Sequence, residues 1–120
     1  MSNPVKAFGV IPEIPKDTLA IINNIFEIEK KLLLHGDAGN AMRNVSKIKE
    51  AIEASKLSYE DPQGQPFTET RTDLEASIAG QFTENLVVVE VIKPIIRYGT
   101  NENSYVVQKG IVVVESKGQK

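Results

Sequence analysis

The segment Asn85-Leu86-Val87-Val88-Val89-Glu90-Val91-Ile92 carries the strongest strand signal in the chain. β-branched residues dominate it and its apolarity is nearly continuous, a composition typical of strands. Pro94 limits this strand or places a bulge there, because proline cannot donate to a strand ladder. Residues 95–98 then resume the strand, so we expect a sheet to form around this segment.

The residues that follow predict a strand partner. Residues 99–103 (Gly-Thr-Asn-Glu-Asn) form a polar turn, and residues 105–115 (Tyr-Val-Val-Gln-Lys-Gly-Ile-Val-Val-Val-Glu) have the composition of a return strand. This order predicts a hairpin with a loop of about five residues. Gly110 interrupts the return strand, which predicts a bulge or a close approach of two backbones.

The residues just before the central strand give a mixed signal. Residues 57–60 are compatible with a short strand, and Asp61-Pro62-Gln63-Gly64 predicts a turn in which glycine takes a positive φ. Periodicity does not decide between a short helix and a strand for residues 68–80. Both alternatives stay open from the sequence.

Two helices are predicted further towards the N-terminus. Asp17 follows Pro15 and is suited to be an N-cap, and Gly36 is placed to end the first helix. Residues 37–40 form a short connection to a second helix over residues 41–55. A short link between two helices predicts an antiparallel hairpin.

The apolar stripes of these helices are wide, which predicts neighbours on more than one side. Two helices alone enclose little volume. Pairing the hairpins of two copies into a four-helix bundle would bury the stripes, so we expect a homodimer. The residues expected to dimerise are Ile21, Ile22, Ile25, Phe26, Leu33, Val45 and Ile52.

The predicted fold class is therefore α+β, with an N-terminal antiparallel helical hairpin followed by a small, mainly antiparallel β-head. Residues 1–16 contain three prolines and are expected to form an extended arm. Residues 17–56 would form the hairpin and serve dimerisation. Residues 57–120 would form the head and bind a partner.

Composition limits the function. Apolar residues make up 41% of the chain and charged residues 25%, values typical of globular proteins. The net charge of −2 argues against nucleic-acid binding, which requires a basic surface. No basic run exceeds Lys30-Lys31, no apolar run could span a bilayer and no signal peptide begins the chain. The absence of cysteine excludes disulfides and suits a cytoplasmic protein, so we expect no membrane association and a cytoplasmic location.

The residues available for catalysis are few. His35 is the only histidine, and we interpret it as a helix C-terminal residue favoured by the helix dipole. Asp37 nearby is insufficient for a metal site. Glu69, Asp73 and Glu75 surround Arg71 and are typical of a solvated surface. We therefore expect no enzyme activity, no catalytic residue, no cofactor and no metal.

Polar and aromatic residues gather around Pro94 and the following loop. Tyr and Arg are enriched in protein–protein hot spots, so these residues are candidates for partner binding. The alternative is that the tyrosines pack across strands and the cations protect a sheet edge. The candidate residues are Lys93, Arg97, Tyr98, Asn101 and Tyr105.

The order of these features resembles the C-terminal part of GrpE, the nucleotide exchange factor of DnaK-type ATPase chaperones. Residues 64–68 (Gly-Gln-Pro-Phe-Thr) resemble the turn of that family, residues 85–92 its central strand and residues 111–114 its closing strand. The long N-terminal coiled coil of the family is missing. The resemblance implies a dimeric scaffold whose head binds a chaperone ATPase and promotes nucleotide release without covalent chemistry.

Two hypotheses therefore follow from the sequence. The first is a GrpE-type co-chaperone, with a DnaK-type chaperone ATPase as partner. The second is an unrelated adaptor or assembly protein, of a phage or a multiprotein machine, that binds through an edge of the β-head.

Overall fold

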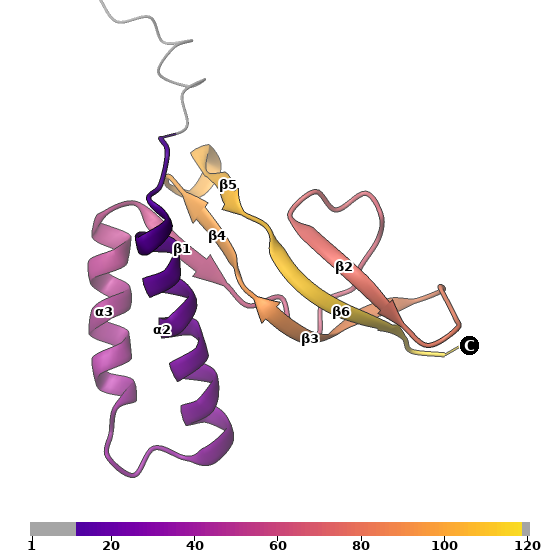
Figure 1. Ribbon diagram of the computed structural model, residues 1–120, viewed down its shortest axis with the longest axis horizontal. Helices are drawn as coiled ribbons and strands as arrows, with labels where there is room; N and C mark the ends of the chain where they lie inside the picture. The colour runs from indigo at the N-terminus through magenta and orange to yellow at the C-terminus, as the bar shows by residue number, and fades with distance from the viewer. Residues whose placement is uncertain (1–11, 119–120) are drawn as a thin grey trace, which may run out of the picture.

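A computed structural model describes residues 12–118 (Figure 1). Within these residues, two helices come first and six strands follow, with one short 3-10 helix between the fourth and fifth strands. The mixed α+β fold class is confirmed. The elements are α2 (Lys16–His35), α3 (Met42–Ala54), β1 (Leu57–Glu60), β2 (Leu74–Ala79), β3 (Leu86–Lys93), β4 (Ile95–Tyr98), η1 (Asn101–Asn103), β5 (Tyr105–Gln108) and β6 (Gly110–Ser116).

Helix α2 starts one residue before the predicted N-cap and ends where the sequence places its end. Pro15 occupies the N-cap position, and its carbonyl accepts hydrogen bonds from the backbone N–H groups of Thr18 and Leu19. Gly36 follows the last helical residue with φ 94° and donates its N–H to the Leu32 carbonyl at 2.9 Å. A positive φ favours glycine at this position.

Asp37 holds the start of α3. Its two carboxylate oxygens accept the backbone N–H groups of Ala41 at 2.6 Å and Met42 at 2.8 Å. The first N–H groups of a helix have no partner inside the helix, so this carboxylate satisfies two of them. Asp37, in the connection between the helices, therefore caps the N-terminus of α3 and has a structural role.

The strands form two small sheets that follow one another along the head. Sheet A has the order β1-β4-β5 and sheet B the order β2-β6-β3. All neighbouring pairs are antiparallel except β2 with β6, which run parallel. In Figure 1 α2 and α3 lie side by side next to sheet A, and sheet B extends away from them.

The predicted return strand over residues 105–115 does not form one continuous strand. It divides at Lys109 into β5 in sheet A and β6 in sheet B. Pro94 divides the opposite strand into β3 and β4 in the same way. Gly110 fits the predicted close approach, because a Cβ atom there would lie 2.9 Å from Leu74 Cδ2 and 3.0 Å from Ile95 Cγ1.

The segment that periodicity left open contains a strand. Residues 74–79 form β2, paired in parallel with β6 from Leu74 opposite Gly110 to Ala79 opposite Glu115. Leu74 is buried in the core and Ala76 packs against it. The non-local partner β6 decides the strand conformation, because six residues contain too little periodicity to do so alone.

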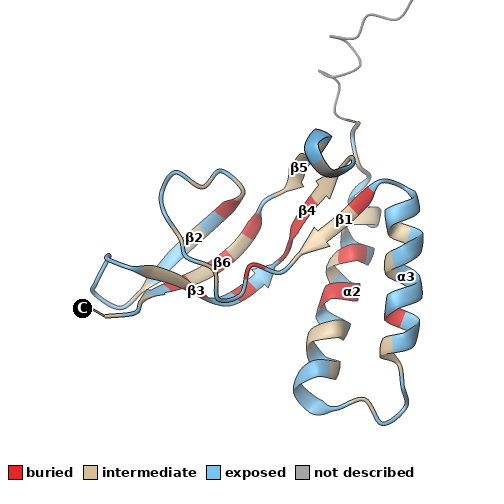
Figure 2. Ribbon diagram, turned by 180° about the vertical axis from the view of Figure 1, so that it is seen from behind, coloured by how far each residue is buried: buried red, intermediate tan, exposed pale blue. Residues whose placement is uncertain are grey.

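Two hydrophobic clusters join the helices to the head (Figure 2). Phe26 of α2 belongs to a cluster with Val88, Val91, Val112 and other sheet B residues. Ile22 of α2 forms a second cluster with Leu57 and Ile96. One helix therefore contributes to both parts of the core.

Most of the predicted N-terminal arm, residues 1–11, lies outside the described residues. Within the described part, Ile14 packs against the cluster of Ile22, Leu57 and Ile96. Lys16, the last residue of the predicted arm, already belongs to α2.

Candidate protein-binding surfaces

The five predicted partner-binding residues follow the chain from the end of β3 to the start of β5. Lys93 is exposed at the end of β3, and Asn101 begins η1. Tyr98 and Tyr105 are direct partners across β4 and β5, and both are half-buried. Tyr98 also packs against the cluster that contains Ile22. These two rings therefore contribute to packing within the chain.

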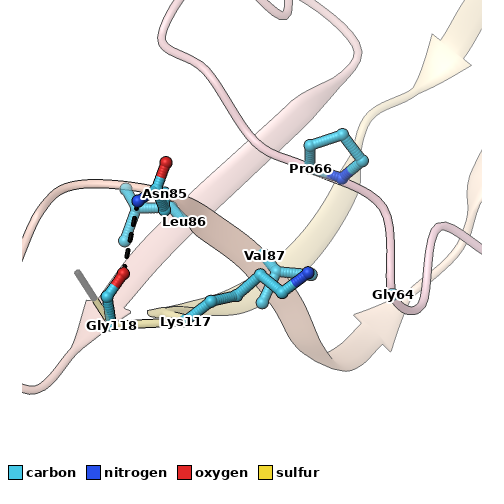
Figure 3. Close-up of a pocket in the computed structure, with 7 residues that line it drawn as sticks. All are labelled: Gly64, Pro66, Asn85, Leu86, Val87, Lys117 and Gly118. Carbon is cyan, nitrogen blue, oxygen red and sulfur yellow. Dashed lines mark hydrogen bonds between the residues drawn. The ribbon is translucent and has the colours of Figure 1, made fainter. Parts of the chain in front are cut away.

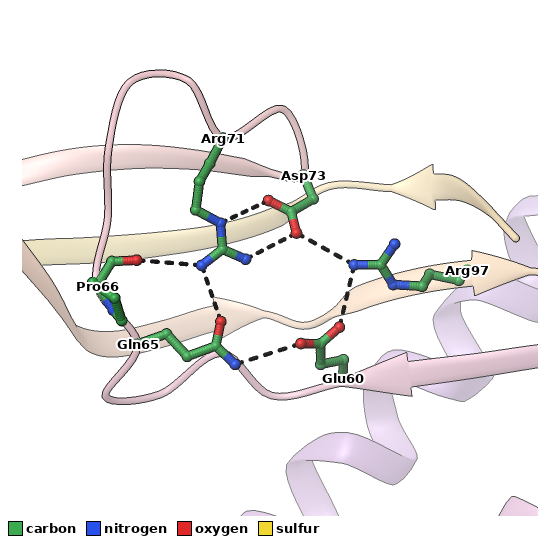
Figure 4. Close-up of polar contacts among 6 residues, drawn as sticks. All are labelled: Glu60, Gln65, Pro66, Arg71, Asp73 and Arg97. Carbon is green, nitrogen blue, oxygen red and sulfur yellow. Dashed lines mark hydrogen bonds and ion pairs between the residues drawn. The ribbon is translucent and has the colours of Figure 1, made fainter. Parts of the chain in front are cut away.

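Arg97 is engaged in ion pairs within the chain (Figure 4). Its Nη2 lies 3.3 Å from Glu60 Oε1 on β1 and 3.3 Å from Asp73 Oδ2, just before β2. The guanidinium therefore bridges the two sheets. A partner that used Arg97 would have to compete with both carboxylates.

Arg71 extends these contacts into a network of Glu60, Gln65, Arg71, Asp73 and Arg97, the Arg71–Arg97 network. Its Nε and Nη2 donate to the two oxygens of Asp73 at 3.0 and 2.9 Å, a bidentate pair. Its Nη1 donates to Gln65 Oε1 at 3.0 Å and to the Pro66 carbonyl at 3.3 Å. Gln65 in turn donates to Glu60 at 3.4 Å. The network fixes the long loop between β1 and β2.

The charges of Arg71 and Asp73 in this network stabilise each other, which is typical of a structural ion pair. The hydrogen bond from Arg71 is the main cause that lowers the pKa of Asp73, and burial opposes it. The same contact raises the pKa of Arg71. Both groups stay charged near neutral pH. The sequence predicted a solvated acidic surface here. The only sign of the ion pair in the sequence was the spacing of Arg71 and Asp73, two residues apart.

Most of the predicted dimerisation residues are covered by their own chain. Ile22 and Phe26 are 1% and 2% exposed, and both belong to the core shared with the head. Ile25 and Val45 are also buried, and Ile52 is half-buried. Of the predicted set only Ile21 and Leu33 are exposed, at 58% and 73%. Further exposed apolar residues on these helices are Ile28, Leu34 and Ile48.

Two neighbouring hollows share Pro66, Asn85 and Leu86, and together we call them the Pro66 groove. Figure 3 shows the residues that line the first of them. One hollow of about 400 Å³ is lined by Asn85, Leu86 and Lys117, and there Asn85 Nδ2 donates to the Gly118 carbonyl at 3.2 Å. A second hollow of about 540 Å³ shares Pro66 and Leu86 and includes Ile78. The sequence alone did not predict this groove, because its residues come from four separate segments.

Polar contacts fix the helices on the head. The Tyr59 hydroxyl donates to Glu29 Oε1 at 2.7 Å, and Lys49 lies 3.4 Å from the other oxygen of Glu29. Burial, followed by the contact with Glu29, raises the pKa of Tyr59. Asn23 and Gln108 exchange two amide hydrogen bonds of 3.1 and 2.9 Å. The position of the helices on sheet A is therefore specified by polar contacts as well as by packing.

No group of three or more metal-binding side chains occurs among residues 12–118. His35 is exposed at the end of α2, and the Asp37 carboxylate accepts hydrogen bonds from the N-terminus of α3. Neither of the two described helices is long and apolar enough to cross a membrane.

No protein-family model matches the sequence, and no match was found among curated proteins or solved structures.

Proposed function

We propose that the chain is a non-catalytic protein-binding module of the GrpE type, which promotes nucleotide release from a DnaK-type chaperone ATPase. One observation carries the proposal: the turn and the closing strand of the resemblance lie on the two sides of β3, which contains its central strand. The turn at residues 64–68 hydrogen-bonds to β3 through Gly64 N–H to Val88 O and Phe67 N–H to Leu86 O, both at 2.9 Å. The closing strand β6 pairs with the other edge of β3.

The mechanism of such a module is allosteric binding. A head that binds the open state of a nucleotide-binding domain more tightly than the closed state shifts the population toward the open state. Nucleotide then leaves, because the open state holds it more weakly, and the coupling is reciprocal. No covalent step is required of this chain.

In this proposal the chain acts as a homodimer through the exposed apolar residues of its helices. Ile21 and Ile28 stand seven residues apart on α2, so they share one stripe. The residues covered by the head cannot serve a second copy without unpacking. Of the predicted set, Ile21 and Leu33 are exposed and remain available for a dimer contact.

A nucleotide-release assay tests the proposed function. A DnaK-type chaperone is loaded with a fluorescent nucleotide, and its release is followed after addition of the chain. We expect acceleration, and we expect Lys93→Glu to weaken it because Lys93 is exposed at the edge of the predicted contact. Lys47→Glu, an equal charge change on the exposed side of α3, is the matched control. No acceleration at saturating excess of the unmodified chain removes the exchange-factor proposal.

The second candidate function is an adaptor or assembly protein that binds through the head edge. Strand β2 is an edge strand of sheet B and presents backbone groups that can pair with an added strand. Ile78 on β2 lines the Pro66 groove and is 45% exposed, and Phe82 just beyond the strand is 57% exposed. This alternative predicts that Ile78→Lys abolishes partner binding. It also predicts that the unmodified chain does not accelerate nucleotide release from a DnaK-type chaperone.

A further inference from the structure

Sheet B has two faces with different surroundings. The pairing registers place alternate residues of its three strands on one face, which we call the open face. Its members are Glu75, Ser77, Ala79, Val87, Glu90, Lys93, Ile111, Val113 and Glu115. The opposite face carries Val88, Val91, Val112 and Val114, which are at most 1% exposed.

The central strand of sheet B has the composition of a strand covered on both faces. β6 contains the run Ile111-Val112-Val113-Val114, in which apolar residues occupy outward as well as inward positions. Strands with one wet face normally alternate apolar and polar residues.

Within residues 12–118, neither hydrophobic cluster includes Ile111 or Val113, and both remain half-buried. The two residues of β3 that lack a partner in β6, Val89 and Ile92, are exposed at 40% and 48%. The open face therefore has an apolar centre that the described chain leaves partly uncovered.

The charges on the open face are mostly of one sign and are unpaired. Glu75, Glu90 and Glu115 are exposed, one on each strand, and none makes an ion pair or side-chain hydrogen bond among the described residues. Lys93 at one end is the only cation of the set. Apolar residues at the centre with carboxylates around them are complementary to an apolar stripe flanked by Lys or Arg.

We propose that the open face of sheet B binds a basic amphipathic helix of a partner protein. A helix is the element that most often covers a sheet face, since its apolar stripe matches the width of a few strands. A second copy is a poorer occupant, because it would bring a net charge of −2 and three further glutamates to the contact. This binding is separate from the proposed nucleotide exchange and does not depend on it.

A peptide titration tests the proposal. The probe is a fluorescent synthetic peptide of roughly 15 residues, about the length at which isolated helices begin to be stable, with Leu at helical spacing and Lys elsewhere. A second peptide replaces every Lys with Glu. Binding is measured by anisotropy at low and high salt, and the site is mapped from amide chemical shifts of the labelled full chain.

Two triple variants distinguish binding at the open face from non-specific attraction between a basic peptide and an acidic chain. The triple variant Glu75→Gln, Glu90→Gln, Glu115→Gln should weaken the Lys peptide about tenfold, since exposed ion pairs are individually weak but add. The control Glu27→Gln, Glu50→Gln, Glu53→Gln removes the same charge from exposed positions on the helices and should change binding less than about twofold, because these carboxylates lie off the face.

The expected shifts lie in residues 86–93 and 110–116, and the Glu peptide should not bind. Equal weakening by the two triple variants, or shifts confined to the helices or the Pro66 groove, would overturn the proposal. It also fails if the open-face variant changes the mass of the free chain in light scattering, because a second copy would then be the occupant.

Discussion

The Tyr59 hydroxyl on β1 donates a hydrogen bond of 2.7 Å to Glu29 on α2. The two residues are 30 positions apart in sequence, and their contact joins the helices to the head beside the edge-to-face pair of Tyr59 and Phe26. The helices are thus held on the head by a directional contact as well as by apolar packing.

Tyr59→Phe should lower the free energy of unfolding by about 1.5–3 kcal/mol, because it removes a hydrogen bond to a carboxylate and keeps the ring. Tyr98→Phe is the matched control, since its ring is half-buried and its hydroxyl makes no hydrogen bond in the described structure. Urea unfolding measures both. Equal losses in the two variants would contradict a specific role for the Glu29 contact.

Gly110→Ala should destabilise the chain by about 1–3 kcal/mol, the usual range for overpacking. The new Cβ would meet Leu74 and Ile95 where the chain passes from sheet A to sheet B. Gly39→Ala, with no atom within 4 Å of its Cβ position, should change stability by less than about 0.5 kcal/mol. Thermal unfolding followed by circular dichroism measures both variants, and a neutral Gly110→Ala would show that the junction has room.

Asp73→Asn should destabilise the chain near neutral pH and much less in acid. The folded pKa of Asp73 is lowered, so its carboxylate contributes stability above the ordinary value of 3.8 and loses this contribution as the pH falls through the lowered pKa. The difference in unfolding free energy between wild type and Asp73→Asn should therefore shrink below pH 3.8.

The control for Asp73→Asn is Glu75→Gln, measured near neutral pH, because the exposed Glu75 carboxylate makes no ion pair in the described structure. It should cost less than about 0.5 kcal/mol. A constant difference between wild type and Asp73→Asn across the whole pH range would contradict a lowered pKa at Asp73.

Ile21→Glu should convert the proposed dimer into single chains, because it places a charge in the exposed apolar stripe of α2. Ala20→Glu is the control, an exposed neighbour on another side of the same helix. Light scattering at micromolar concentration gives the mass of each. A wild-type mass of one chain would exclude the dimer.

The sequence by itself determined the α+β class, the end of α2 at Gly36, the strand around Val88 and the tight site at Gly110. These features depend on local chemistry: glycine at positive φ, β-branched runs, and the lack of a side chain. Each of these features can be predicted from the few residues around it.

Only the tertiary structure decided the conformation of residues 74–79, the division of the return strand between two sheets, and the face that α2 turns to the head. From the sequence, the stripe containing Ile22 and Phe26 is predicted to bind a second copy of the chain. In the structure it packs against Leu57, Ile96 and sheet B of the same chain. Periodicity shows that a face is apolar but does not name its partner, because burial free energy is not directional. The partner is fixed by contacts between segments far apart in the chain, such as Tyr59 with Glu29.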